Sequence, residues 1–215
     1  KYYLQLHPTY ITQLKNIWLL KEIPAKVSKK LNLPSSDEGI DLITKTKQGK
    51  YWAIQCKYKE DESNSITRKE LSTFTDLAFT ICKNIELGLV CTSVNKVSHK
   101  LRMHGDKLSY CSGEVWRGLD EKFFDRLRKF IEGETTPLKP LEPRPHQQRA
   151  IQNAYTYFIE EENNRGKLIM PCGTGKSLTG YWISQKLKSK KILVAVPSLA
   201  LIRQTLEVWA TESVS

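Results

Sequence analysis

The sequence predicts an α/β protein of two domains, and three observations carry that prediction. The chain has 215 residues, which is enough for two domains of modest size. Stretches that alternate like β-strands and stretches with helical spacing follow one another along it. Four prolines fall within residues 137–145, and proline neither continues a helix nor donates to the centre of a sheet. We therefore expect a first domain at residues 1–136, a linker at 137–143 and a second domain at 144–215.

The first domain is expected to open with helices. Residues 1–31 follow a mostly helical pattern, and Pro24 either divides two helices or begins the second. Two strands are expected at residues 39–46 and 51–58, joined by a turn that contains a glycine. The apolar side chains at helical spacing in the opening segment are Leu14, Ile17, Trp18, Val27 and Leu31.

A mixture of helices and strands continues to the linker. A helix is expected within residues 63–82, which begin with capping residues. Residues 85–94 form an apolar run typical of a buried central strand. A short helix at 98–106, a weak strand at 108–111 and an amphipathic helix within 118–133 follow. The apolar side chains expected to face inward are Leu71, Phe74, Leu77, Ala78 and Ile81 in the first helix and Phe123, Phe124, Leu127, Phe130 and Ile131 in the last.

The second domain alternates regularly between helix and strand. Helices are expected at residues 146–161, 175–188 and 199–210, with strands at 166–171 and 191–197 between them. Such alternation predicts a parallel sheet. Two strands do not form a sheet with its own core, so we expect only part of this domain to lie within the chain.

Composition and charge limit the class of protein. The net charge of +11 suits a polyanionic partner such as nucleic acid, although a lysine-rich surface can equally serve only to keep a protein in solution. No apolar run is long enough to span a membrane and no secretory signal opens the chain, so we expect a cytoplasmic protein. The five cysteines include no C-x-x-C pair and suit reduced thiols. A zinc site built from His99, His104 and Cys111 would not match a standard spacing.

The stretch MPCGTGKS at residues 170–177 lies between an expected strand and an expected helix, which is the context of a phosphate-binding loop. Gly173, Thr174 and Gly175 would let backbone N–H groups wrap around phosphates at the helix N-terminus. Lys176 would reach the β- and γ-phosphates of ATP, and Ser177 would ligate Mg²⁺. Met170 replaces the first glycine of the strict pattern. The alternative reading is a glycine-rich turn with an exposed lysine.

With its neighbours, this loop resembles the opening of a superfamily 2 helicase or translocase, which has a RecA-like fold. The resemblance rests on RPHQ at residues 144–147, on the loop itself and on ILVAVPSLALIRQ at 192–204. It implies that Gln147 reads adenine and that Pro197 and Ser198 contact the nucleic-acid backbone. The D-E-x-H box, the arginine finger and the second lobe of that family are absent from the sequence, so residues 1–215 are not expected to hydrolyse ATP by themselves.

Polar side chains converge on the expected hairpin of the first domain. The period of two along a strand places Gln55 and Lys57 on one face, and Asp41 lies on the neighbouring strand. Asp41, the amide oxygen of Gln55 and the backbone carbonyl of Cys56 are oxygen ligands suited to Mg²⁺, while Lys57 would orient water and neutralise charge on an attacked phosphate. The alternative is a half-exposed strand whose polar face meets water, and spacing alone does not decide between the two.

The same residues resemble the Mrr-like branch of PD-(D/E)xK nucleases, in which G-[IV]-D precedes Q-x-K. The resemblance covers roughly residues 10–115. It implies a mixed sheet flanked by helices and a Mg²⁺-dependent nuclease. The family often adds an acid from its first helix, and Glu22 is the one acid within the first 36 residues. Asp37 and Glu38 are weaker candidates for a metal ligand.

Together the two domains resemble the N-terminal part of type ISP restriction enzymes, which are related to type I and type III motor subunits. This resemblance implies a site-specific, ATP-dependent endonuclease that acts on double-stranded DNA, with translocase, methyltransferase and target-recognition domains in the same polypeptide or complex. Two other functions stay open. A nuclease fold that has lost cleavage could hold DNA for a motor, or an RNA helicase could carry an accessory domain.

Overall fold

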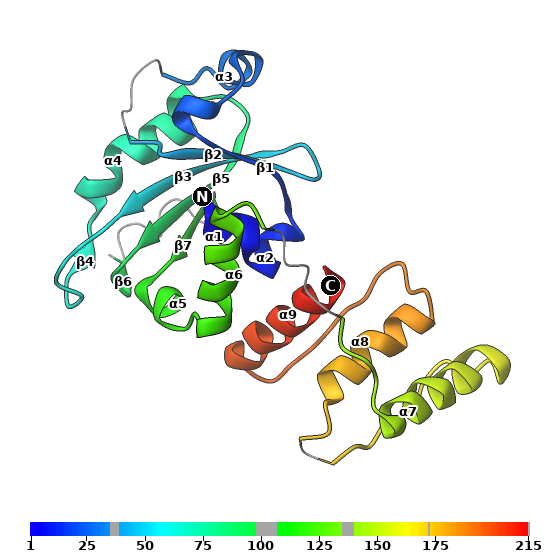
Figure 1. Ribbon diagram of the computed structural model, residues 1–215. Helices are drawn as coiled ribbons and strands as arrows, with labels where there is room; N and C mark the ends of the chain where they lie inside the picture. Colours follow the sequence, from blue (N-terminus) through cyan, green and yellow to red (C-terminus); the bar gives the residue numbers. More distant parts are fainter. Residues whose placement is uncertain (35–38, 98–106, 135–139, 172, 215) are drawn as a thin grey trace. The chain divides into compact units, whose positions relative to one another are not determined.

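The computed structural model describes residues 1–34, 39–97, 107–134, 140–171 and 173–214, without the side chain of residue 200 (Figure 1). It divides into two compact units, Lys1–Thr136 and Pro137–Ser215. The predicted short helix at 98–106, together with His99, His104 and Cys172, lies outside the described residues. None of the described helices is both long and apolar enough to cross a membrane.

A five-stranded mixed sheet forms the centre of unit 1, in the order β1-β2-β3-β5-β7. β1 to β3 are antiparallel, whereas β3, β5 and β7 are parallel. A second, two-stranded sheet pairs β4 with β6. The strands are β1 (Leu14–Leu19), β2 (Leu42–Thr46), β3 (Tyr51–Lys57), β4 (Ser65–Ile66), β5 (Ile85–Thr92), β6 (Lys96–Val97) and β7 (Leu108–Cys111).

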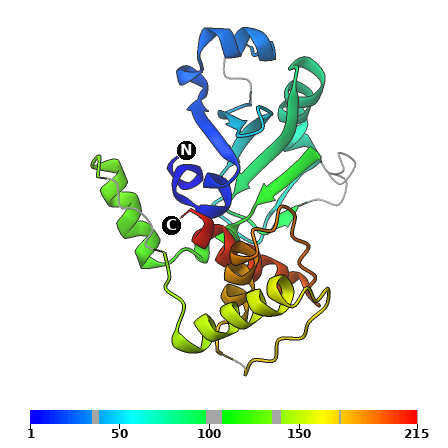
Figure 2. The ribbon, with the colours of Figure 1, turned by 90° about the vertical axis from the view of Figure 1, so that its right-hand side faces the viewer.

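Helices cover both faces of the main sheet. Figures 1 and 2 show α4 on one face and α1 on the other. The helical elements of unit 1 are α1 (Tyr2–Leu6), α2 (Pro8–Ile11), η1 (Leu20–Glu22), α3 (Ala25–Leu31), α4 (Arg68–Asp76), η2 (Leu77–Ile81), α5 (Gly113–Arg117) and α6 (Glu121–Ile131). Because helices cover both faces of the central strands, β2 and β3 are buried along most of their length instead of alternating between buried and exposed residues.

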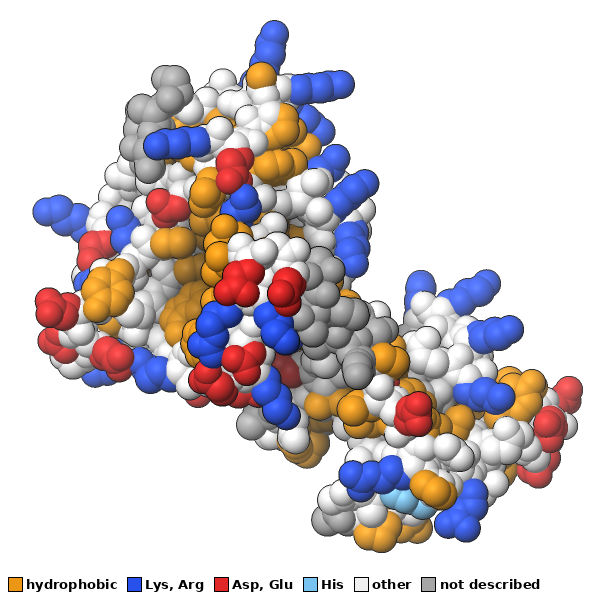
Figure 3. Space-filling view, viewed as in Figure 1, with side chains coloured by type: hydrophobic (Ala, Val, Ile, Leu, Met, Phe, Trp, Pro, Cys, Tyr) orange, Lys and Arg blue, Asp and Glu red, His pale blue; other side chains and the backbone are white. Residues whose placement is uncertain are grey.

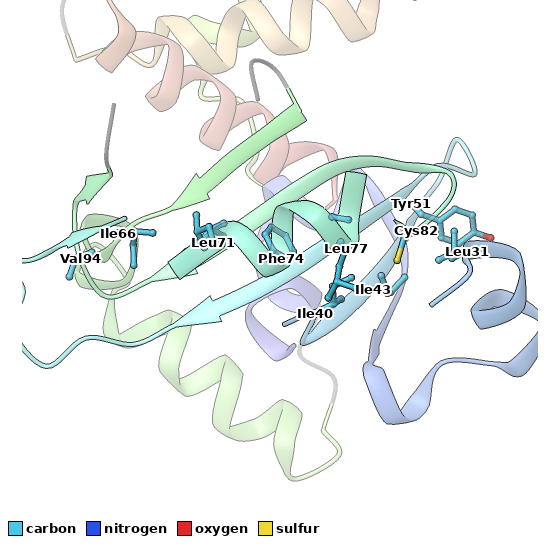
Figure 4. Packing of buried hydrophobic residues seen from close by; sticks show 13 residues of the cluster. Leu31, Ile40, Ile43, Tyr51, Ile66, Leu71, Phe74, Leu77, Cys82 and Val94 are labelled. Atoms are coloured by element: carbon cyan, nitrogen blue, oxygen red, sulfur yellow. The ribbon is translucent and has the colours of Figure 1, made fainter. Parts of the chain in front are cut away.

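The larger apolar cluster lies between α4 and the sheet. Figure 4 shows Leu71, Phe74 and Leu77 packed with Ile40 and Ile43. Full burial of a leucine or phenylalanine side chain stabilises the fold by about 1.5–3 kcal/mol. The α4 helix is also capped, since the Thr67 hydroxyl accepts from the N–H of Glu70 at 3.3 Å. As predicted, Leu71, Phe74, Leu77 and Ala78 are buried.

Ile81 does not face the core as predicted, and 43% of it is exposed. The helix changes from α to π geometry at Leu77–Ile81, and this change in the turn alters where each later side chain points. On α6, Phe123 is buried, but Phe124 and Ile131 are 38% and 57% exposed. The apolar face of α6 is therefore only partly covered by the described residues, and the predicted inward direction of these two side chains is wrong.

The helical reading of residues 14–18 is wrong, because Leu14–Leu19 forms β1. Its pairing with β2 shifts register between Leu14 and Asn16. Such a bulge lets Leu14 and Ile17 pack against the same cluster, although three residues of regular strand would place them on opposite faces. Trp18 packs on the other side. A bulged strand thus reproduced helical spacing. Pro24 directly precedes α3, so it begins the second helix, as one of the two readings predicted.

Unit 2 contains the three predicted helices, seen as α7 (Pro145–Tyr155) with its π-helical extension η4 (Thr156–Glu160), α8 (Lys176–Lys186) and α9 (Leu199–Ser213). No strand is assigned to residues 166–171 or 191–197, in contrast to the prediction. A strand exists only through pairing, and these segments have no paired neighbour among the described residues. Ile169 and Leu193 are accordingly 79% and 95% exposed.

Charged side chains are spread over both units. On the face seen in Figure 3, Lys and Arg side chains are mixed with Asp and Glu side chains at the centre, whereas the upper edges of both units carry Lys and Arg side chains alone.

Candidate functional site

Asp41 lies immediately before β2 and is fixed at both its backbone and its side chain. Its N–H donates to the carbonyl of Ile54 at 2.9 Å. Its carboxylate Oδ2 accepts from the N–H of Cys56 at 2.6 Å. These two bonds reach β3 on either side of Gln55, so the hairpin brings Asp41 and Gln55 together, as the strand pattern predicts. Asp41 is half-buried.

Gln55 is buried, with 3% of its surface exposed, and its Oε1 has no hydrogen-bond partner among the described residues. The backbone of Gly39 comes close to this amide. At Gly39 φ is +115°, and a β-carbon there would lie 3.2 Å from Gln55 Nε2. A buried carbonyl oxygen without a partner costs free energy, and a hard cation beside a carboxylate would satisfy it. The donor set of Asp41 and Gln55 therefore fits Mg²⁺.

Lys57 is the last residue of β3 and is half-buried. It lines a pocket of about 490 Å³ together with Cys56, Tyr58, Trp116 and Arg117. Neither Asp41 nor Gln55 lines this pocket. An ammonium group at the end of β3 can neutralise charge on a bound phosphate, but the approach of Lys57 to the other two residues stays a prediction.

Three cysteines lie side by side across the parallel strands, which the sequence pattern did not reveal. The pairing aligns Cys56 with Cys91 and Cys91 with Cys111. A side-chain hydrogen bond with Cys91 lowers the pKa of the Cys56 thiol, although burial opposes this effect. The cysteines stand 35 and 20 residues apart in the sequence, so only the register of three strands brings them together.

Lys59 is a second residue that the sequence pattern did not single out. Its Nζ donates to the carbonyl of Ser65 at 2.8 Å and pairs with Glu70 Oε1 at 2.8 Å. Its backbone N–H and carbonyl both bond to the hydroxyl of Ser93, each at 2.8 Å. These contacts fix the segment that leaves β3 and so hold the chain that follows Lys57.

The candidate acids outside the hairpin are placed less favourably. Glu22 lies in η1, whose first residue, Leu20, donates to the carbonyl of Asp41 at 3.2 Å. The carboxylate of Glu22 pairs with Lys1 Nζ at 2.6 Å and accepts from the N–H of Leu19. Asp37 and Glu38 lie outside the described residues. Among the residues that the structure does describe, no group of three His, Cys, Asp or Glu side chains could hold a metal.

The described part of the glycine-rich loop at residues 173–177 has a backbone suited to phosphate binding. Gly173 and Gly175 have φ values of +77° and +78°, which glycine adopts without strain. Lys176 begins α8, and its Nζ donates to the carbonyl of Pro171 at 3.1 Å. The Thr174 hydroxyl donates to the same carbonyl at 2.7 Å. These features fit the phosphates of a nucleotide, with the N-terminus of an 11-residue helix behind them.

Gln147 is buried against this loop. Its Nε2 lies 3.3 Å from the carbonyl of Thr174 and 3.4 Å from that of Gly175. It also lies 3.3 Å from the hydroxyl of Thr179, while Oε1 accepts from the N–H of Arg144 at 2.9 Å. In this structure the amide therefore bonds the loop and its own helix, which leaves its expected contact with adenine a prediction.

The other residues implied by the helicase resemblance lie at the ends of α8 and α9. Ser177 is the second residue of α8 and contacts the indole of Trp209, whose Nε1 is 3.2 Å from Ser177 Oγ. Pro197 precedes Ser198, which caps α9 by accepting from the N–H of Leu201 at 3.3 Å. Both Ser198 and its neighbour Leu199 are exposed.

Two family models match the chain, one in each unit. Residues 5–107 match the model described as "Restriction endonuclease", and residues 140–213 match "Type III restriction enzyme, res subunit". The first match contains the Asp41 hairpin and the second contains the glycine-rich loop.

A solved structure and a curated protein are also similar. The structure titled "ATP-dependent Type ISP restriction-modification enzyme LlaBIII bound to DNA" aligns with 98% of this chain at 26% identity and a TM-score of 0.71. The probable helicase A859L of African swine fever virus (isolate Pig/Kenya/KEN-50/1950) is 34% identical over 88 residues, which are 41% of this chain. The chain spans 13% of the first protein and 10% of the second.

Fold, loop and family matches agree for each unit. The chain carries a restriction endonuclease domain of the Mrr-like kind, followed along the sequence by a helicase-like region related to the res subunit of type III restriction enzymes, and it is similar over 98% of its length to a type ISP enzyme.

Proposed function

We propose that unit 1 is a Mg²⁺-dependent endonuclease that cuts double-stranded DNA, and that an ATP-driven DNA translocase, to which unit 2 belongs, controls it. The observation that carries this proposal is the Asp41 carboxylate fixed beside the buried, unpartnered Oε1 of Gln55. The similarity to an ATP-dependent type ISP enzyme bound to DNA supports DNA as the substrate and ATP hydrolysis as the energy source.

The residues of the hairpin divide the chemistry between them. A bound Mg²⁺ would supply a Lewis acid for the scissile phosphate and lower the pKa of a water. Asp41 contributes the negative charge that holds the cation, and Gln55 contributes a neutral oxygen. Lys57 neutralises charge that develops on the phosphate and orients the attacking water. The carbonyl of Cys56 is a further oxygen at the same place. Mg²⁺ commonly keeps water and substrate oxygens as its other ligands, so one carboxylate is compatible with this role.

The glycine-rich loop serves the second half of the proposal. Backbone N–H groups at Gly173–Gly175 would hold phosphates, Lys176 would reach the terminal phosphates and Ser177 would ligate Mg²⁺ of ATP. Pro197 and Ser198 would touch the DNA backbone. We also propose a cytoplasmic location, which fits an enzyme that acts on DNA. Because the chain spans 13% of the similar type ISP enzyme, we propose further motor, methyltransferase and target-recognition domains in the same polypeptide or complex.

A second function is a nuclease fold that binds DNA without cutting it. One observation favours it. Among the described residues, the hairpin offers Asp41 as its only carboxylate, and Glu22 is paired with Lys1. This module would still hold DNA for the motor, but the hairpin would have no catalytic role.

Plasmid nicking by the full-length protein with ATP and Mg²⁺ tests the proposal. Asp41→Asn keeps an oxygen for the N–H of Cys56 and removes the charge, and Lys57→Ala removes the ammonium group. Each should lower the cleavage rate by about two orders of magnitude or more. Lys50→Ala, at the opposite end of β3, is the matched control and should cut like the parent. Cleavage at the parent rate by both hairpin variants would leave only the DNA-binding function.

A further inference from the structure

Two indole groups join α8 to α9, and one of them reaches the glycine-rich loop. Trp209 Nε1 lies 3.0 Å from the backbone carbonyl of Ser177 and 3.2 Å from its hydroxyl oxygen. Trp182 Nε1 lies 3.2 Å from Oε1 of Glu212, a buried carboxylate. Both bonds connect the same pair of helices, labelled in Figure 1, but only the first involves a residue of the loop.

Packing fixes the indole of Trp209 independently of its N–H group. Its ring meets the ring of Tyr181 edge-on, with centroids 5.4 Å apart and an interplanar angle of 67°. It also lies over Gly180, where an added β-carbon would be 3.9 Å from the indole. The ring position is therefore set by Tyr181 and Gly180, and it directs the N–H at Ser177.

The bond to the hydroxyl leaves Ser177 able to ligate a cation. A serine hydroxyl has one hydrogen and two lone pairs. The single indole N–H is shared between the backbone carbonyl and the hydroxyl of Ser177. It engages one lone pair of the hydroxyl, so the second stays available to a metal while the rotation of the hydroxyl is restricted. An oriented ligand binds its metal more tightly than a freely rotating one, because less freedom is lost on binding.

We propose that Trp209 is a positioning residue that holds the Ser177 hydroxyl ready to ligate the divalent cation of a bound nucleotide. This inference rests on the proposed nucleotide site of unit 2. In this proposal α9, which lies outside the loop, affects the affinity for the cation and the nucleotide together through the hydroxyl of Ser177.

Binding of a fluorescent, non-hydrolysable ATP analogue to the full-length protein tests it, with Mg²⁺ and with EDTA. Trp209→Phe keeps the ring and removes the N–H. It should weaken binding about two- to tenfold in Mg²⁺, the size expected for one neutral hydrogen bond, and leave binding in EDTA unchanged. Trp182→Phe, which removes the other indole N–H between the same helices, should change neither. An equal loss in Mg²⁺ and EDTA would show a general structural role and overturn the proposal.

A double-mutant cycle with Ser177→Ala shows whether Trp209 acts through the hydroxyl. In the Ser177→Ala background, Trp209→Phe should have no further effect on Mg²⁺-dependent binding, and an additive effect would overturn the proposal. Should Trp209→Phe unfold, Ser177→Ala still tests the bond with the indole in place. Mg²⁺ and the analogue should change tryptophan emission in the Trp182→Phe protein and not once Ser177→Ala is added, and an equal change in both would overturn the proposal.

The same measurements separate this proposal from the site on which it rests. If the parent binds the analogue no better with Mg²⁺ than with EDTA, or if Ser177→Ala binds like the parent, the nucleotide site itself is wrong. If Ser177→Ala loses the Mg²⁺ dependence and Trp209→Phe keeps it in full, only the positioning role is wrong.

Discussion

The free energy of unfolding and the cleavage rate should respond differently to substitution at Gln55. The amide is 3% exposed, and its Oε1 has no partner among the described residues, so its burial is costly for the fold. Gln55→Met keeps a similar volume without the carbonyl. We expect it to unfold at the same or a higher denaturant concentration than the parent, and to lose DNA cleavage because an oxygen ligand is missing.

Gln55→Glu is the complementary change. It keeps an oxygen at the site and adds a charge, so we expect residual cleavage and a changed preference between Mg²⁺ and Mn²⁺. Denaturant unfolding and plasmid nicking on the same preparations measure both variants. Full cleavage by Gln55→Met would show that Gln55 is not a metal ligand. A large loss of stability in this variant would show that the amide of Gln55 supports the fold instead.

Gly175 and Gly173 offer a matched pair of substitutions in the loop. Both have φ near +78°, where a β-carbon is strained by roughly 1–2 kcal/mol. At Gly173 the added carbon would meet nothing within 4 Å, whereas at Gly175 it would lie 2.6 Å from Gln147 Nε2. Gly175→Ala should therefore lower the melting temperature and nucleotide affinity more than Gly173→Ala. This difference between the two variants should disappear when Gln147→Ala removes the amide that the added carbon would meet. If the difference persists, the contact with Gln147 does not explain the larger effect of Gly175→Ala.

The elements that the sequence predicted well are those with local causes. The hairpin of β2 and β3 follows from two strand-length segments around a short turn with a glycine, and α4 follows from Thr67, Glu70 and a regular apolar face. The strand β1 was missed because a bulge gave Leu14 and Ile17 a common face, which is decided by pairing with β2. Strands expected at 166–171 and 191–197 depend likewise on non-local partners.

The candidate site was likewise predicted only in part. Strand period predicted that Asp41, Gln55 and Lys57 would come close together; backbone pairing places Asp41 beside Gln55, whereas the approach of Lys57 stays a prediction. Strand period could not predict that the carboxylate of Asp41 bonds the N–H of Cys56, nor that Cys56, Cys91 and Cys111 align, because both depend on the register between strands.

The α4 helix begins with an ion pair that should make stability depend on pH. Bonds from Lys59 and Thr67 lower the pKa of Glu70 from 4.5 to about 2. A carboxylate with a depressed pKa in the folded state stabilises it fully above the pKa of the unfolded state. That contribution should therefore be complete above about pH 4.5 and be lost as pH falls towards 2.

Glu70→Gln isolates this effect, because glutamine can still accept from the N–H of Thr67 but cannot pair with Lys59. The difference in unfolding free energy between parent and variant should be constant near neutral pH and shrink below pH 4.5. Glu62→Gln, which breaks a more exposed pair with Arg117, is the control and should have little effect. A difference that stays the same down to pH 2.5 would show that the charge of Glu70 is not the stabilising feature.

At the scale of the molecule, the two candidate sites lie in separate compact units. The hairpin of Asp41 belongs to Lys1–Thr136, and the loop of Lys176 belongs to Pro137–Ser215. Both large apolar clusters consist of residues from the first unit, which therefore has its own core. Damage to one site should not unfold the other unit.

If the motor controls the nuclease, loss of the motor site should stop DNA cleavage, whereas loss of the nuclease site should not stop the motor. Asp41→Asn should stop DNA cleavage and leave ATP consumption and movement along DNA at the parent rate. Lys176→Ala should stop ATP consumption, movement along DNA and cleavage, because we propose that cleavage requires translocation. Lys176 is exposed and its ammonium bonds only loop carbonyls among the described residues, so the variant should melt within a degree or two of the parent.

ATPase, translocation and nicking assays on the full-length variants measure this asymmetry. ATP consumption at the parent rate by Lys176→Ala would contradict the assignment of the loop. Lys176→Ala could also lose ATP consumption and still cut DNA at the parent rate. That result would show that the nuclease acts without the motor and that unit 1 needs only its own metal and its own core. A slower ATPase in Asp41→Asn would show that the hairpin acts on the motor, which a nuclease that only follows translocation has no physical means to do.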